Sequence, residues 1–596
     1  MSLQFIFGNS GSGKSHYLYQ QIVEESIRHP EKNYLVLVPE QFTMQTQKDL
    51  CMAHPRGGIM NIDVLSFGRL AHRVFEETGK ERQPILDDEG KNLVLRKIAG
   101  NYEDELTVLK GNLKKQGYIS EVKSVISEFT QYGIDFEQLD SFMEGLNPES
   151  YLYYKLKDIR KVYEGFEDYL RDKYITKEEL LDVLSQTVPE VKMLKDSVVA
   201  MDGFTGFTPV QNRLIGELLK VCDKIMLTVE IDRREDPFVY KHPYQLFALS
   251  KQMVTSLTEV AQEVRVEIDE PVWLCKNPPY RFKENPEMAF LEEELFRYSR
   301  RKYSGEKMQS ISLHEVHTPQ EEAQYVAEEI RRLVREEGYR YREIAVIASD
   351  LNTYADSLEK ACERYEIPVF MDHKKSILLN SFVEYLRSLL VMVEQNYTYE
   401  SVFRYLRTGL CGFTRDEVDR LENYCLALDL KGFKKWDQVW VRKTPMTKKE
   451  ELEELNQLRV RFVEKLTPLH TVLKKRRKTV KEITLAVYEY LVQEKIQEQL
   501  AELEQKFQEE GELALAKEYA QIYRIVLELF DKFVELLGEE EIPLKEYCEL
   551  LDAGLEEAKV GVIPPSLDQV VIGDVERTRI KNIRALFFVG ANDTLL

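Results

Sequence analysis

A glycine-rich loop close to the first residue is the feature that most constrains how this chain can fold. Residues 8–15 read Gly-Asn-Ser-Gly-Ser-Gly-Lys-Ser, which matches the phosphate-binding pattern Gly-x4-Gly-Lys-Ser. The apolar residues 3–7 before the loop predict a buried strand, and residues 17–27 after it predict a helix. This order presents consecutive backbone N–H groups and a helix N-terminus to a triphosphate. The sequence therefore predicts an α/β fold with a nucleotide site after its first strand.

The loop also predicts how ATP and Mg²⁺ are held. Lys14 is expected to reach the β- and γ-phosphates, and the Ser15 hydroxyl to take one position on Mg²⁺. Asp202 ends an apolar strand, residues 197–202, where phosphate-loop ATPases place a carboxylate that holds Mg²⁺, usually through water. The residues predicted to bind the nucleotide are Gly8, Asn9, Ser10, Gly11, Ser12, Gly13, Lys14, Ser15 and Asp202, with Ser15 and Asp202 as metal ligands. A chance Gly/Ser turn is the alternative interpretation.

The residue after Asp202 bears on hydrolysis. Phosphate-loop ATPases commonly carry a glutamate there to polarise the attacking water, but this chain has Gly203. ATP binding is therefore expected, and fast hydrolysis is not. A further strand, residues 224–229, leads to Glu230-Ile231-Asp232, where a motor would carry its γ-phosphate sensor.

Polar and aromatic residues follow two more predicted strands, where open α/β sheets bind ligands. Residues 34–38 form an apolar run stopped by Pro39, so Gln41 and Thr43 are site candidates. Residues 62–65 lead into a predicted helix, at whose start Phe67 could stack on a base and Arg69 could hold a phosphate or a base edge. Phe67 as a core residue and Arg69 as a solvated cation is the alternative.

Composition limits the classes of protein that fit. At 596 residues the chain should hold three or four domains of about 150 residues. A net charge of −21 argues against non-specific attraction to nucleic acid, so a nucleic-acid site must be local or shared with a partner. Seven scattered cysteines predict a reducing cytoplasm, with neither a disulfide framework nor a zinc or iron–sulfur cluster in this chain. No signal peptide or membrane contact is expected.

The pattern along the chain predicts a coarse duplication of a sheet unit with a helical insertion. The first sheet domain is assigned to residues 1–88 and 194–265, with a helical insertion over 89–193 and a proline-containing linker over 266–308. The second is assigned to residues 309–380 and 559–596, with strands at 311–316, 344–348, 366–370, 569–574 and 585–593. Its helical insertion covers 381–558.

This layout resembles superfamily 1 DNA helicases, which have two RecA-like parallel sheets, each interrupted by a helical subdomain. The motifs look like those of B subunits of AddAB-type helicase/nucleases: the phosphate loop and residues 37–41, 66–71, 202–204, 563–569 and 589–593. The resemblance covers essentially all 596 residues. It implies a heterodimer with a motor subunit, AddA, that acts in double-strand break repair by recombination. The AddB-type chain would then scan single-stranded DNA for the hotspot Chi. The implied DNA contacts are Gln41, Thr43, Phe67 and Arg69, with His72, Phe204 and Phe207 behind them.

Departures from the motor pattern imply a subunit that binds ATP without acting as a motor. Gly203, Thr205 and Gly206 replace polar members of the Mg²⁺ motif, and Ser349 stands where motors usually place an arginine. Residues 573–579 lack the usual histidine and lysine pattern. The family's C-terminal nuclease domain and its iron–sulfur cluster are not found in these residues, so a fragment that does not cut DNA is expected. The alternatives are an independent phosphate-loop ATPase or nucleotide kinase, and a structural scaffold with a vestigial nucleotide site.

Overall fold

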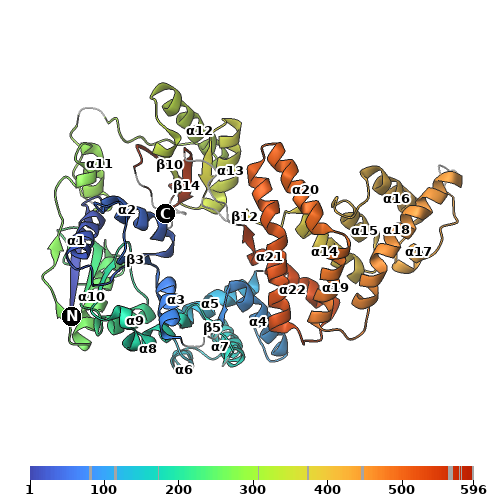
Figure 1. Cartoon of the computed structure of the whole chain (residues 1–596), viewed down its shortest axis with the longest axis horizontal. Helices are drawn as coiled ribbons and strands as arrows, with labels where there is room; N and C mark the ends of the chain where they lie inside the picture. Colours follow the sequence, from blue (N-terminus) through green and yellow to red (C-terminus); the bar gives the residue numbers. More distant parts are fainter. Residues whose placement is uncertain are drawn as a thin grey trace. The chain divides into compact units, whose positions relative to one another are not determined.

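The computed structural model describes residues 1–79, 84–112, 117–171, 173–297, 299–305, 308–371, 375–443, 449–560, 568–575, 578, 580 and 582–592. The chain divides into two compact units. Figure 1 colours the chain along the sequence and labels many of the elements described below. Unit 1 comprises residues 1–86 and 124–316, and unit 2 comprises residues 87–123 and 317–596. Each is described by itself below.

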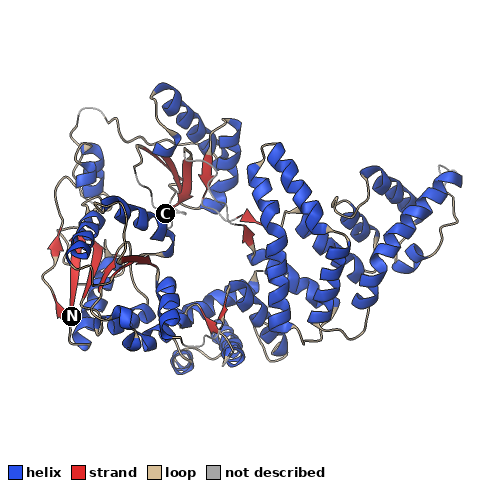
Figure 2. Cartoon of the chain, in the orientation of Figure 1, coloured by secondary structure: helices blue, strands red, loops and turns tan. Residues whose placement is uncertain are grey.

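Unit 1 is built on a parallel sheet whose strand order is β3-β2-β6-β7-β1-β8, with β9 also pairing with β1 (Figure 2). Its strands are β1 Ser2–Gly8, β2 Tyr34–Leu37, β3 Ile62–Leu65, β6 Val198–Met201, β7 Lys224–Glu230, β8 Glu267–Ile268 and β9 Val272–Trp273. The predicted strands at 3–7, 34–38, 62–65, 197–202 and 224–229 are therefore confirmed. Central strands buried on both faces explain the continuous apolar runs.

Helices cover both faces of this sheet. On one face Ile6 packs with Leu18 and Ile22 of α1 Lys14–Arg28. On the other, Phe5 and Phe7 pack in a core that includes Leu70 of α3 Phe67–Thr78. The remaining helices of unit 1 are η1 Glu40–Phe42, α2 Thr43–Ala53, α6 Phe136–Glu144, α7 Tyr151–Leu170, α8 Glu179–Thr187, η2 Val188–Glu190, η3 Lys192–Leu194, α9 Pro209–Leu219, α10 Ala248–Glu263, η4 Tyr280–Phe282 and α11 Pro286–Glu294. A short parallel pair, β4 Ile85–Leu86 and β5 Ile175–Thr176, lies within this unit.

Unit 2 contains a second parallel sheet of order β11-β14-β10-β15. Its strands are β10 Ile344–Ala348, β11 Val369–Met371, β14 Val570–Asp574 and β15 Ala585–Val589. Its core packs against α12 Pro319–Glu336 and α13 Leu351–Arg364. The alternation of strands and helices in the sequence predicted this sheet, although strands β10 and β14 are separated by more than two hundred residues.

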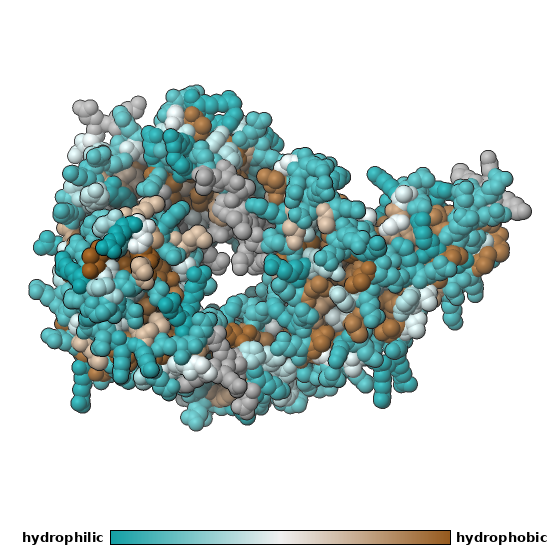
Figure 3. All heavy atoms as spheres, viewed as in Figure 1, coloured by the Kyte–Doolittle hydropathy of each residue, from teal (hydrophilic) through white to brown (hydrophobic). Residues whose placement is uncertain are grey.

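A helical region lies between those strands in the sequence, as predicted for 381–558. Its helices are α14 Ser381–Glu394, α15 Tyr399–Leu406, α16 Arg415–Leu428, α17 Phe433–Asp437, α18 Lys449–Leu473, α19 Val480–Gln493, α20 Ile496–Glu509, α21 Leu513–Leu537 and α22 Leu544–Glu557. The other elements are η5 Tyr341–Glu343, α4 Asp88–Asn101, α5 Tyr118–Tyr132 and the antiparallel pair β12 Lys375–Ser376 and β13 Lys559–Val560. The boundary between the two units falls within α5. The surface in view is mostly hydrophilic with scattered apolar patches (Figure 3).

Three predictions differ from the structure. Residues 311–316 were predicted as a strand but have no regular secondary structure, and Leu313 is 93% exposed. A strand needs a neighbour for its N–H and C=O groups, and none of the described strands pairs with this segment. Residues 266–308, predicted as a linker, instead contribute β8, β9 and α11 to unit 1. Residues 89–123 of the predicted first insertion belong to unit 2, as do residues 87 and 88 of the predicted first sheet domain.

Candidate nucleotide-binding site

The phosphate loop connects the carboxyl end of β1 to the first turn of α1. Gly11 and Gly13 have φ angles of 72° and 94°, a region that only glycine adopts without strain. A Cβ at Gly8 would lie 2.7 Å from the backbone oxygen of Leu274, so this position also requires glycine. Ser12 Oγ and Asn9 Oδ1 are buried without a hydrogen-bond partner among the described residues. The Ser12 hydroxyl is a donor beside a helix N-terminus, so it fits a phosphate ligand and fits a chance turn poorly.

Lys14 is held inside the loop. Its Nζ donates a hydrogen bond of 2.9 Å to the backbone oxygen of Asn9. Burial lowers the pKa of the Lys14 ammonium, while the carboxylates of Glu230 and Asp202 act in the opposite direction. The Lys14 ammonium therefore lies within the loop, in the position expected to contact a bound phosphate.

Asp202 is the best-fixed polar residue of the site. It is 2% exposed, and three hydroxyl groups donate to its carboxylate. Ser15 Oγ and Thr228 Oγ1 lie 2.9 and 2.7 Å from Oδ1, and Tyr19 OH lies 2.7 Å from Oδ2. Neither Tyr19 nor Thr228 was identified from the sequence. Tyr19 lies four residues after Ser15, on the same face of α1, which helical spacing could have indicated.

The Ser15 and Asp202 pair fits a magnesium ion. Mg²⁺ is bound in nucleotide sites by one or two protein oxygens together with phosphates and water, so it needs no cage of protein ligands. No group of three His, Cys, Asp or Glu side chains that could hold a metal occurs within the described ranges. The Ser15 hydroxyl at the start of α1 and the Asp202 carboxylate after β6 are thus the oxygen ligands that this part of the site offers.

Residues 203–208, which follow Asp202 directly, include no carboxylate. Gly203 has φ 80° and begins the turn that leads to the capping box of α9 at Thr208. At the end of β7, Asp232 is engaged by two guanidinium groups, those of Arg234 at 2.6 Å and Arg297 at 2.8 Å. Burial opposes ionisation of Asp232, but these arginines hold its pKa below the usual value. Asp232 therefore anchors the chain locally.

The predicted DNA contacts follow three neighbouring strands of the sheet. Strands β3, β2 and β6 are adjacent and parallel, so the residues after them lie at one edge of the sheet. Gln41 in η1 and Arg69 in α3 are exposed there, and His72 is exposed one turn after Arg69. Gln41, Arg69 and His72 are therefore exposed polar residues that follow neighbouring strands of one sheet.

The aromatic candidates form a cluster. Phe67 is 7% exposed and lies in the core, with ring centroids 5.5 Å from Phe204 and 6.3 Å from Phe207. Burial favours the core interpretation of Phe67, because a buried ring offers no face to a base. Phe204 and Phe207 are partly exposed. Thr43 is 6% exposed, and its hydroxyl donates to the backbone oxygen of Glu40.

Comparisons with known proteins agree with this architecture. A family profile described as "ADDB, N-terminal" matches residues 5–292, and one described as "UvrD-like helicase C-terminal domain" matches residues 285–586. The B subunit of an ATP-dependent helicase/deoxyribonuclease from Lachnoclostridium phytofermentans is 42% identical over 602 residues. The chain belongs to the AddB family of helicase/deoxyribonuclease B subunits. Its two parallel sheets are the RecA-like sheets of that family's helicase fold.

Other AddB-family relatives carry the same name. They are 34% identical in Clostridium novyi and 33% identical in Acetivibrio thermocellus. The alignments with these three relatives cover all of this chain but only 51 to 52% of each relative. The chain therefore spans about half the length of the AddB-family relatives that it matches.

In the second sheet of this AddB-family chain, Ser349 is the residue predicted to stand in place of a motor arginine. Ser349 follows β10, and its hydroxyl donates to the backbone oxygen of Gly590 at 2.7 Å. The side chain therefore joins the ends of two strands. Residues 576, 577 and 579 of the predicted departure at 573–579 lie outside the described residues, as do 563–567 and 593 of the family motifs.

None of the described helices is both long enough and apolar enough to cross a lipid bilayer.

Proposed function

We propose that this chain is an ATP-binding, non-motor subunit of an AddAB-type helicase/nuclease that scans single-stranded DNA for the hotspot Chi during double-strand break repair. Family membership supports a role in such a complex, and the naming of the relatives as B subunits implies a partner subunit. The partner proposed here is an AddA-type motor subunit.

The nucleotide part of the proposal depends on one observation. The hydroxyl of Ser15, at the start of α1, is hydrogen-bonded to the buried carboxylate of Asp202, immediately after a loop that holds Lys14. This is the combination that Mg²⁺ and a triphosphate need. Bound Mg²⁺ would neutralise phosphate charge, with Ser15 as a direct ligand and Asp202 acting through water. The structure of the loop makes a vestigial scaffold the weaker alternative.

Two residues, one after a strand of each sheet, differ from those of a motor: Gly203 in the first domain and Ser349 in the second. Gly203 gives no carboxylate to polarise water, and Ser349 is occupied by a backbone contact. A motor needs a second-domain cation at the γ-phosphate. The chain would therefore use nucleotide to stabilise a DNA-binding conformation.

DNA scanning is argued from the common edge of β3, β2 and β6. Gln41 and Arg69 are exposed there, and each side chain can form bidentate hydrogen bonds with a base edge. Phe204 and Phe207 supply partly exposed rings for stacking. Because the net charge is −21, the proposed DNA track is a local one shared with the partner and not a general DNA-binding surface.

Calorimetry with ATP and Mg²⁺ tests the nucleotide site. The purified chain should bind ATP, and Lys14→Ala should abolish binding. The control Lys195→Ala removes an exposed lysine at the amino end of β6, away from the loop. Equal affinity in the Lys14 variant would contradict the proposal.

Steady-state ATP turnover with single-stranded DNA tests the non-motor role. Slow turnover is expected with or without DNA. Robust DNA-stimulated hydrolysis that depends on Lys14 would favour the alternative, a working phosphate-loop ATPase. Co-purification with an AddA-type subunit, followed by an assay of Chi-dependent arrest, tests the partner and the scanning role.

A further inference from the structure

Residues 272–297, here named the strap, run across the mouth of the phosphate loop within unit 1. At its start, β9 pairs with β1, and the backbone N–H of Leu274 donates to Phe7 at 2.8 Å. Further on, the backbone N–H of Arg281 donates to Gly11 at 3.0 Å. A Cβ on Gly11 would lie 2.7 Å from that of Arg281, so the approach requires glycine at this loop position. The strap therefore contacts the loop directly.

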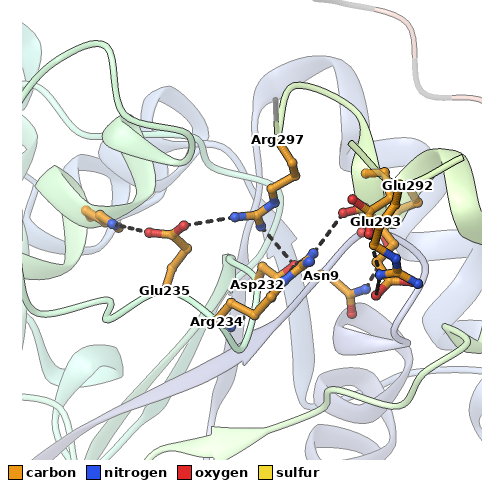
Figure 4. Close-up of polar contacts among 10 residues, drawn as sticks. Asn9, Asp232, Arg234, Glu235, Glu292, Glu293 and Arg297 are labelled. Carbon is orange, nitrogen blue, oxygen red and sulfur yellow. Dashed lines mark hydrogen bonds and ion pairs between the residues drawn. The ribbon is translucent and has the colours of Figure 1, made fainter. Parts of the chain in front are cut away.

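One carboxylate of the strap enters the loop itself. Asn9 Nδ2 donates to Glu292 Oε2 at 3.0 Å (Figure 4). Burial raises the pKa of Glu292, and the carboxylates of Asp232 and Glu230 add to that rise. Hydrogen bonds from the Asn9 side chain and the Ser10 backbone oppose it. An acidic group thus already uses the donors in the first half of the phosphate loop.

Ion pairs fix the helix that carries Glu292. Arg297, just after α11, bridges Asp232 at 2.8 Å and Glu235 at 2.9 Å, and its side chain is 15% exposed (Figure 4). Arg234 Nη2 donates to the backbone oxygen of Glu293 at 2.8 Å. These contacts join α11 to the chain after β7, and they therefore fix the backbone that carries Glu292 next to the phosphate loop.

The third phosphate of a nucleotide would meet this carboxylate. Backbone N–H groups of such loops hold the α- and β-phosphates, and the lysine reaches the β- and γ-phosphates. Here Lys14 Nζ contacts the backbone of Asn9, the same residue whose side chain binds Glu292. A γ-phosphate drawn to Lys14 therefore lies next to a negative charge, whereas a diphosphate ends before it.

We propose that Glu292 is a specificity-determining residue that makes this site prefer nucleoside diphosphates to triphosphates. This inference rests on the proposed nucleotide site and adds its ligand preference. ATP binding requires the Glu292 side chain to leave Asn9 and Ser10, which removes a contact between α11 and the loop. ADP binding does not require this. In partly screened surroundings, two like charges a few ångströms apart shift affinity by about tenfold or more.

Calorimetric titration with ADP and ATP, each with Mg²⁺, tests the preference. Wild-type chain should bind ADP about tenfold more tightly than ATP. Glu292→Gln keeps the shape and removes the charge, so ATP affinity should rise by about tenfold while ADP affinity changes by less than about threefold. Glu284→Gln makes the same charge change at an exposed position of the strap and should leave the ratio unchanged.

Hydrogen exchange gives a second readout that does not need the variant. A non-hydrolysable ATP analogue should reduce the protection of residues 286–297, and ADP should not. Nucleotide binding that depends on Lys14, with an ADP/ATP ratio unchanged by Glu292→Gln and equal strap protection, would overturn the inference alone. Binding of neither nucleotide by wild type or Glu292→Gln would overturn the proposed nucleotide site together with it.

Discussion

Replacement of Asp202 should separate the structural role of its carboxylate from its role toward magnesium. Three hydroxyl groups donate to this carboxylate, and two of them belong to Tyr19 and Thr228, which are each 4% exposed. Water cannot easily replace the lost acceptor at buried positions. Each buried polar group left unpaired costs about 1–3 kcal/mol, so Asp202→Ala should cost about 2–6 kcal/mol. Tyr19 OH has Thr46 Oγ1 as a second partner at 3.3 Å, which favours the lower half of that range, about 2–4 kcal/mol.

Asp202→Asn should be much milder. The amide oxygen can still accept from Ser15 and Thr228, which both bond to Oδ1. The amide nitrogen would take the place of Oδ2 and donate to Tyr19, whose hydroxyl could then donate to Thr46. The net loss of stability should be about 1 kcal/mol or less. Magnesium-dependent ATP affinity should nevertheless fall, because the charge is gone.

Hydrogen exchange measured by mass spectrometry is the suitable assay. Peptides from β6, β7 and α1 should exchange roughly 30- to 1000-fold faster in Asp202→Ala, and within about fivefold of wild type in Asp202→Asn. Peptides from α21 and α22 in unit 2 provide an internal reference, and Asp196→Asn removes an exposed charge as a control. Unchanged protection in Asp202→Ala, or equal loss in both Asp202 variants, would refute this account of the site.

Three further predictions use other parts of unit 1. Burial, with the nearby Glu179, raises the pKa of Glu167 in the folded chain to about 7. The folded chain therefore holds this proton more tightly than the unfolded chain does. The resulting stability is fully present below the pKa of Glu167 in the unfolded chain and is lost as pH rises through 7. Glu167→Gln should therefore stabilise the chain by about 1–2 kcal/mol at pH 8 and hardly at all at pH 4, as measured by urea unfolding; equal effects at both pH values would contradict this. Gly11→Ala should weaken nucleotide binding and expose the strap to protease, because Gly11 has φ 72° and its added Cβ would meet Arg281; unaltered cleavage would count against the strap contact. Gln41→Ala and Arg69→Ala should each reduce discrimination between DNA sequences by about 1–3 kcal/mol in the assembled complex, and an unaltered Chi response in both would remove them from the proposed track.

Local pattern was enough to predict most of the first sheet. Apolar runs stopped by polar residues, proline or glycine marked β1, β2, β3, β6 and β7 because central parallel strands are buried on both faces. Segment 311–316 shows the limit of this reasoning. Its alternation of apolar and polar residues is compatible with a strand, but a strand exists only where a neighbour accepts its hydrogen bonds, and that neighbour cannot be identified from the segment.

The aromatic residue Phe67 shows a second limit. Its place at the start of α3 after β3 was correctly predicted, yet whether its ring would face a base or the core depended on Phe204 and Phe207, which lie more than a hundred residues later. The same holds for residues 266–308. Prolines and mixed charges are typical of a linker, but pairing of β8 and β9 with β1 brings the segment into the first unit.

The sequence by itself determined the phosphate loop, the strands beside it, the missing carboxylate at Gly203 and the resemblance to the AddB family. These depend on residue type and short spacing, which a chain carries before it folds. Only the tertiary structure decided that Tyr19 and Thr228 hold Asp202, and that Glu292 bonds to Asn9 across 283 residues of sequence. Such contacts arise because packing of the sheet and its helices brings distant segments together, and no local pattern encodes which side chains then meet.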